Sequence, residues 1–157
     1  MKPPDSVGVD SMDDEHKECT DSFNRAIKDP TSDTLQELHD ILKSHFEHEE
    51  ELIEKHSSKK KNGGSSSFSS LNSHQIDHQR ILKIATNELG RVAAGTGGDT
   101  CSLQQGGREW HKPATTSSSP SPVDIDIDVI HKLVAAFHVH ADTFDALYQA
   151  QVPAWAE

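Results

Sequence analysis

Apolar residues recur every three or four positions along four segments of the chain, which is the spacing of one face of an α-helix. The pattern predicts four amphipathic helices over about residues 12–28, 34–56, 71–94 and 130–152. Asp29-Pro30 ends the first helix, because the residue before a proline is driven out of the α-helical region. The glycines at 95–98 end the third helix, and Pro153 ends the fourth.

Residues 123–129, with the sequence VDIDIDV, alternate between apolar and acidic side chains. This period of two is typical of a strand. The chain offers no second strand candidate to pair with it, so we interpret these residues as the start of the fourth helix.

Two tracts rich in serine and glycine separate the predicted helices, at 57–69 and 96–122, and we expect both to be flexible loops. Residues 1–11 have no clear period and are expected to form an N-terminal arm. We therefore predict one all-α domain, in which residues 12–152 form an up-down-up-down antiparallel four-helix bundle with two inserted loops.

The inward stripe of the second predicted helix contains two polar residues, His45 and Glu49, which lie one turn apart. A buried imidazole beside a buried carboxylate is costly unless both are satisfied, and a metal ion satisfies both. The third helix places His74 and His78 on its own stripe with the same spacing. These four positions predict a site between helices.

The first and fourth helices add His16 and His140 to their inward stripes. Asp145 follows His140 by five residues, which is a rotation of about 140° around an α-helix. A carboxylate at that angle requires a site wide enough for two metal ions. Five imidazoles and two carboxylates exceed what one tetrahedral zinc accepts, and they suit two iron ions bridged by carboxylates.

Composition narrows the class of protein. The 157 residues suit one domain, and the net charge of -11 argues against binding to nucleic acid. No apolar run approaches the length of a membrane span, and we expect a cytoplasmic protein. The two cysteines are too few for a disulfide scaffold, and we expect Cys19 to be a core residue.

Four motifs carry a resemblance to a known family. They are D-x-E-H at 13–16, H-F-x-x-E-E at 45–50, H-x-x-x-H at 74–78 and H-x-x-x-x-D at 140–145. Their order and spacing are similar to those of the hemerythrins, over roughly residues 12–94 and 123–150. Each motif alone is a weak signal, whereas seven ligands in the order of the family are a strong one.

The resemblance implies two iron ions, as Fe2+ or Fe3+, joined by a bridging oxo or hydroxo group. His74, His78 and His140 would hold one iron, and His16 and His45 the other. Glu49 and Asp145 would bridge the two ions. This ligand count leaves one vacant position, at the iron of His16 and His45, where dioxygen would bind. The implied function is non-enzymatic oxygen transport, storage or sensing.

Apolar residues around the predicted site, among them Phe46, Phe137 and Phe144, are expected to line the oxygen pocket and to exclude water. This favours reversible binding over catalysis. Hemerythrins usually carry a tryptophan in the N-terminal arm and another one turn before the histidine of the fourth helix. Here the arm has none and Ala136 stands at the second place.

That departure keeps alternatives open. The open iron could instead react as an enzyme with peroxide or nitric oxide. The chain could also be an iron- or oxygen-sensing interaction module whose folding is coupled to metal binding, or a bundle without metal.

The remaining titratable residues near these motifs are assigned ordinary roles. We expect Glu47, Glu50 and Glu51 to form a solvated acidic face. Six further histidines are expected at the surface or beside the ligands, namely His39, His48, His56, His111, His131 and His138.

Overall fold

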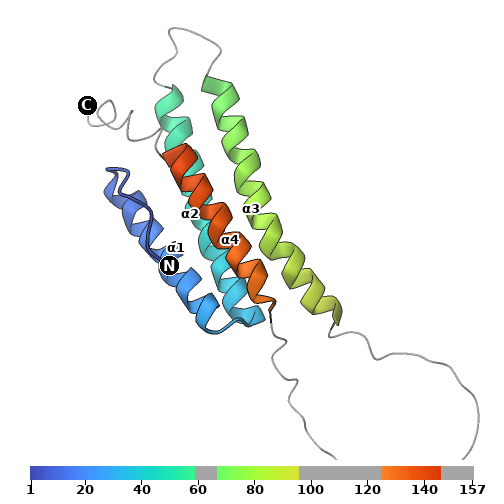
Figure 1. Cartoon of the computed structure of the whole chain (residues 1–157). Coiled ribbons are helices and arrows are strands. Elements are labelled where there is room, and N and C mark those ends of the chain that lie inside the picture. Colours follow the sequence, from blue (N-terminus) through green and yellow to red (C-terminus); the bar gives the residue numbers. More distant parts are fainter. Residues whose placement is uncertain (59–66, 96–124, 146–157) are drawn as a thin grey trace, which may run out of the picture.

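A computed structural model shows an all-helical protein, and it describes residues 1–58, 67–95 and 125–145 (Figure 1). The helices are α1 (Asp10–Lys28), α2 (Ser32–Ser58), α3 (Ser67–Gly95) and α4 (Ile127–His140), and α4 continues into the short π-helix η1 (Ala141–Asp145). The described ranges contain no strand. The predicted all-α class is therefore confirmed.

The four helices pack as a bundle in which each helix packs most extensively against two others (Figure 1). Helix α1 lies against α2 and α4, and α3 lies against the same two helices. The apolar stripes meet in one core, whose largest fully buried side chains include Phe23, Leu35, Leu38, Leu42, Phe46, Ile81, Ile130, Leu133 and Phe137. Burial of these stripes, more than helix propensity, holds such helices together.

The predicted helix boundaries agree with the structure within a few residues where the residues are described. The largest difference is at the connection between α2 and α3. Residues 57–58 belong to α2 and residues 67–69 to α3, so the first connection is shorter than the loop we expected. The rest of that loop and the second loop at 96–122 lie outside the described residues, as does the predicted end of the fourth helix at 146–152. None of the described helices is both long and apolar enough to cross a membrane.

The start of α4 is fixed by contacts with two other parts of the bundle. The side chain of Asp126 caps the helix by accepting from the backbone N–H of Asp128. The backbone N–H of Ile125 donates to the carbonyl of Pro30 at 2.9 Å, and that of Asp126 donates to Glu88 Oε1 at 3.1 Å. The described part of the VDIDIDV segment therefore leads into a helix, as we expected.

The N-terminal arm lies along α1. Val7 is buried, and its backbone N–H donates to Asp13 Oδ1 at 2.8 Å, beside the start of the helix. The amino group of Met1 donates to the side chain of Asn24. These contacts tie the arm to α1, the helix that carries His16.

Candidate metal centre

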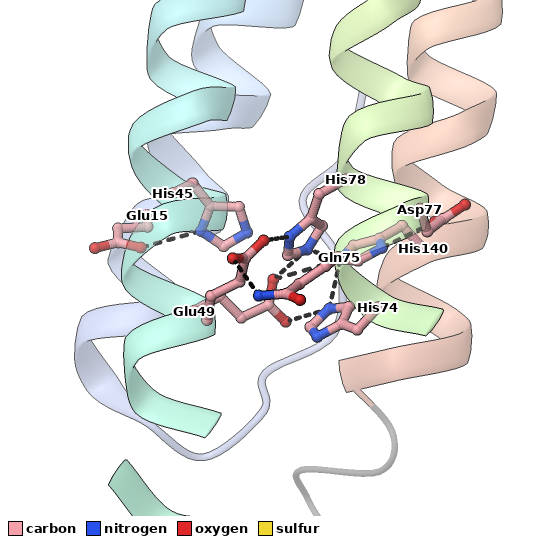
Figure 2. Close-up of polar contacts among 9 residues, drawn as sticks. Glu15, His45, Glu49, His74, Gln75, Asp77, His78 and His140 are labelled. Atoms are coloured by element: carbon pink, nitrogen blue, oxygen red, sulfur yellow. Dashed lines mark hydrogen bonds and ion pairs between the residues drawn. The ribbon is translucent and has the colours of Figure 1, made fainter. Parts of the chain in front are cut away.

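Three imidazoles and one carboxylate converge in the centre of the bundle (Figure 2). Nε2 of His140 lies 3.2 Å from Nε2 of His74 and 3.2 Å from Nε2 of His78. Glu49 Oε2 lies 3.1 Å from Nε2 of His78 and 3.4 Å from Nε2 of His140, and Glu49 Oε1 lies 3.2 Å from Nε2 of His74. The four ligand atoms come from α2, α3 and α4, and all lie within 4.8 Å of one another. All four residues are buried.

Carboxylates on the far side of two of these rings set the direction of their lone pairs. Nδ1 of His78 lies 2.8 Å from Glu50 Oε1, and Nδ1 of His140 lies 3.0 Å from Asp77 Oδ2. An ionised carboxylate only accepts, so Nδ1 is the donor in each pair, and a neutral ring then presents the bare Nε2 to the centre. Such a carboxylate–histidine pair is the usual support of a metal-bound imidazole.

The centre is therefore rich in acceptors. The Nε2 lone pairs of His78 and His140 point at one another and at the Glu49 carboxylate, and acceptors this close repel unless a proton or a cation lies between them. Burial alone would raise the pKa of the Glu49 carboxyl, but any proton that His140, His74 or His78 carries at Nε2 is donated to Glu49 and holds that pKa well below its usual range. The carboxylate is thus ionised, and the group suits a divalent metal ion.

Two further imidazoles, His16 on α1 and His45 on α2, lie beside this group without being part of it. Their ring centroids are 4.9 Å apart, and both rings are buried. Nδ1 of His45 lies 3.0 Å from Glu15 Oε2 (Figure 2), whereas its Nε2 has no hydrogen-bond partner among the described residues. A buried nitrogen in this state is costly, and a metal ion would satisfy it.

His16 is held in its neutral form. Burial lowers the pKa of its imidazole to about 4, and the nearby His45 contributes in the same direction. A metal ligand must be unprotonated, so this shift leaves His16 ready to bind a metal at neutral pH.

Three phenylalanines lie against the imidazoles, as the sequence led us to expect. Phe46 stacks on His78 with centroids 4.0 Å apart, and Phe144 stacks on His74 at 4.6 Å. Phe137 meets the rings of His16 and His45 edge-on, with centroids about 6 Å apart. The rings fix the imidazoles and give the centre an apolar boundary. Whether they line an oxygen pocket remains a prediction.

Six of the seven predicted ligands thus lie in the bundle interior, and the structure brings four of them together as one group. The side chain of Asp145 lies outside the described residues. Its backbone ends η1, and this π-helix corrects one premise about it. The rotation of about 140° from His140 assumed a continuous α-helix, whereas a π-helical turn brings residues five apart closer to the same side of the axis.

Sequence reasoning missed the carboxylates that support the imidazoles. We expected Glu50 on a solvated face, and this was wrong, because it accepts from Gln75 Nε2 at 3.0 Å as well as from His78. Glu15 was noted only as a member of the D-x-E-H motif, and Asp77 was given no role. The signal was present in the sequence: each of these carboxylates is the chain neighbour of a predicted ligand, yet it supports a ligand on another helix.

The other assignments that can be compared with the structure agree with it. Glu47 and Glu51 are exposed, and Cys19 is a fully buried core residue whose thiol pKa is raised by burial. His48 is half-buried beside the ligands and donates to Glu15 Oε1 at 2.6 Å. His39 and His138 are partly exposed, and His131 is exposed. His111 and the side chain of His56 lie outside the described residues.

No family model, curated protein or solved structure matches this chain. The resemblance to the hemerythrins therefore stays a prediction from the four sequence motifs.

Proposed function

We propose that this chain is a non-haem di-iron protein that binds dioxygen reversibly, within an up-down-up-down bundle similar to that of the hemerythrins. The observation that supports the proposal best is that two groups of buried imidazoles lie next to each other, one of them around the Glu49 carboxylate. His74, His78 and His140 surround Glu49, and His16 and His45 lie beside them. One ion alone cannot use five imidazoles, whereas two ions can.

The chain's own residues perform three tasks in this proposal. Five imidazoles would hold the two ions, and Glu49, with Asp145 as a predicted second carboxylate ligand, would bind both of them. Glu15, Glu50 and Asp77 orient three of the imidazoles through their Nδ1 atoms. Phe46 and Phe137 exclude the water that would promote irreversible oxidation. When bound, ferrous ions would supply the electrons that make oxygen binding reversible.

The test begins with anaerobic protein loaded with ferrous iron, which should retain about two irons per chain. Exposure to air should produce a visible absorption band that flushing with argon removes over several cycles. Glu47→Gln, which alters an exposed carboxylate of the same helix, serves as a control and should behave like the unaltered chain. Irreversible conversion to a ferric form on the first exposure would reject the reversible carrier.

A second candidate function is turnover of peroxide or nitric oxide. The observation that favours it is Ala136, which is buried at the place where hemerythrins usually carry a tryptophan. A side chain as small as alanine would leave room for reactants that a tryptophan at this place would exclude. Iron-loaded protein should then consume peroxide or nitric oxide, with an added reductant, faster than the same amount of free iron. Rates equal to free iron would reject this candidate.

A further inference from the structure

We propose that divalent metal ions load this centre in a fixed order and that Glu15 sets the affinity of the second step. The first ion binds at Glu49, His74, His78 and His140, which we call the first half. The second ion binds at His16 and His45, which we call the second half. The inference rests on the proposed two-metal function and adds to it an order and a controlling residue.

The first half is assembled before any ion arrives. Its four donor atoms come from three helices and already lie within 4.8 Å of one another. The rings of His74 and His140 are stacked at 12°, and two of the three imidazoles are oriented by carboxylates. Three nitrogens and one oxygen are a complete set for a four-coordinate ion. A preformed set loses little conformational entropy on binding, so this half binds first.

The second half offers less to an ion. It has two imidazoles of its own, and the carboxylate of Glu49 that it would share already contacts the three imidazoles of the first half. The rings of His16 and His45 meet at 69°, edge to face. An ion entering here also meets the positive charge of the first ion, because Coulomb repulsion is strong in a buried site. Binding at the second half is therefore weaker and follows the first.

Glu15 orients one of the two imidazoles of the second half, that of His45. Its carboxylate accepts from Nδ1 of His45 at 3.0 Å and from Nδ1 of His48 at 2.6 Å, so it links α1 to two positions of α2. The contact with His45 fixes the tautomer in which Nε2 is bare. No contact between Glu15 and a ligand of the first half is found among the described residues. Loss of this carboxylate should therefore act on one half.

A pocket of about 360 Å³ between α1 and α2 provides the matched control. Glu15 and Glu18 both line this pocket, together with His45, but Glu18 is exposed. Glu18→Gln removes the same charge from the same wall as Glu15→Gln and leaves the acceptor of His45 in place. Comparison of the two variants separates the hydrogen bond to His45 from a general loss of negative charge.

The experiment is a titration of metal-free protein with Co2+, followed by calorimetry and by the visible absorption of the ion. The unaltered chain should take up two ions in two resolved steps, and the first half should fill before the second half. Glu15→Gln should weaken the second step by about 10–100-fold and leave the first unchanged. Glu50→Gln, the same substitution at the partner of His78, should weaken the first step. Glu18→Gln should change neither.

Three results would overturn the inference. They are uptake of two ions in a single cooperative step, equal weakening of both steps by Glu15→Gln, and an effect of Glu18→Gln as large as that of Glu15→Gln. The unaltered chain shows whether two steps exist, and Glu15→Gln and Glu50→Gln each assign one step to a half, so one folded variant of the two is enough for the test. A chain that loads two cobalt ions in this order, yet shows no reversible band when its di-ferrous form meets air, would reject the proposed oxygen binding and leave this inference standing.

Discussion

The two halves of the centre are built from the same kind of residue but reach different degrees of assembly. The ring centroids of His74 and His140 are 4.8 Å apart, and those of His16 and His45 are 4.9 Å apart, so proximity does not distinguish the halves. The halves differ in the direction in which their Nε2 atoms point. Nε2 atoms of the first half meet at 3.2 Å around Glu49, whereas Nε2 of His45 finds no hydrogen-bond partner among the described residues.

The halves also differ in the helices that hold them. Helices α2, α3 and α4 each supply ligands to the first half, while the second half depends on α1 and α2. Both halves use the same support, a carboxylate on a neighbouring helix that accepts from Nδ1. The comparison teaches that a supported imidazole is not yet a metal site, because the donor atoms must also converge.

The largest effect is expected at Glu49, the residue that the two halves would share in the proposed centre. Glu49→Gln replaces a buried carboxylate that contacts all three imidazoles of the first half with a neutral amide of the same size. We predict that metal affinity falls at both steps by more than about 100-fold. Loss of a supporting hydrogen bond alone costs about 10–100-fold, and a lost ligand should cost more. Metal analysis after dialysis, together with calorimetry, measures the loss.

Glu47→Gln, an exposed change two residues away, is the control for this variant. If Glu49→Gln leaves either step at its original affinity, Glu49 does not bind the ions of both halves, and this part of the comparison is wrong.

A smaller effect is expected when one half alone is altered. His45→Ala should leave the first half intact, so the chain should still retain about one ion at the affinity of the first step. His78→Ala removes one of the three nitrogens of the first half and should abolish that step. Calorimetric titration of both variants with Co2+ compares them directly.

The contrast between these two variants sharpens the assignment of each imidazole. Equal loss of both ions in each variant would show that the two halves bind metal as one unit. It would contradict the inference that the first half is assembled independently of the second.

The smallest effect is expected from the acid titration of His16 in metal-free protein. Its pKa is about 4 in the folded state against an ordinary value of 6.5, so between these pH values the unfolded chain binds a proton that the folded chain does not. The free energy of unfolding should therefore fall as the pH is lowered from 6.5 to 4. One such proton contributes a slope of about 1.4 kcal/mol per pH unit within this window.

Urea unfolding at several pH values measures this slope. His16→Gln should lower the slope by the contribution of one proton, whereas His131→Gln, at an exposed position of α4, should leave it unchanged. An identical slope in the His16 variant and the unaltered chain would contradict the buried, neutral state of His16.

Much of the fold was accessible to sequence reasoning because it follows from local periodicity. The stripe that contains Leu38, Leu42, His45 and Glu49 has the period of a helix, and the structure buries all four side chains. The same reasoning placed His74, His78 and His140 on inward faces, where the structure brings them together with Glu49. A polar residue on an apolar stripe is conspicuous, so these positions were recognisable without any knowledge of the partner helix.

The supporting carboxylates were not recognisable in the same way. Glu50 lies off the apolar stripe of α2, so the spacing of apolar residues treats it like Glu51, which is exposed. It reaches His78 only because α3 packs against that side of α2. Glu15 and Asp77 depend likewise on which residues of a neighbouring helix lie opposite them. The π-helical turn after His140 also follows no pattern that the apolar spacing reveals.

The sequence by itself determined the helices, their inward faces and the imidazoles and carboxylate that those faces carry, because each depends on spacing along a single helix. Only the tertiary structure decided which imidazoles share a carboxylate, which carboxylate orients each ring, and which half of the centre is assembled. These depend on the rotation and axial offset of one helix against the next. Packing of the whole core sets both quantities, so the residues of one helix do not specify them.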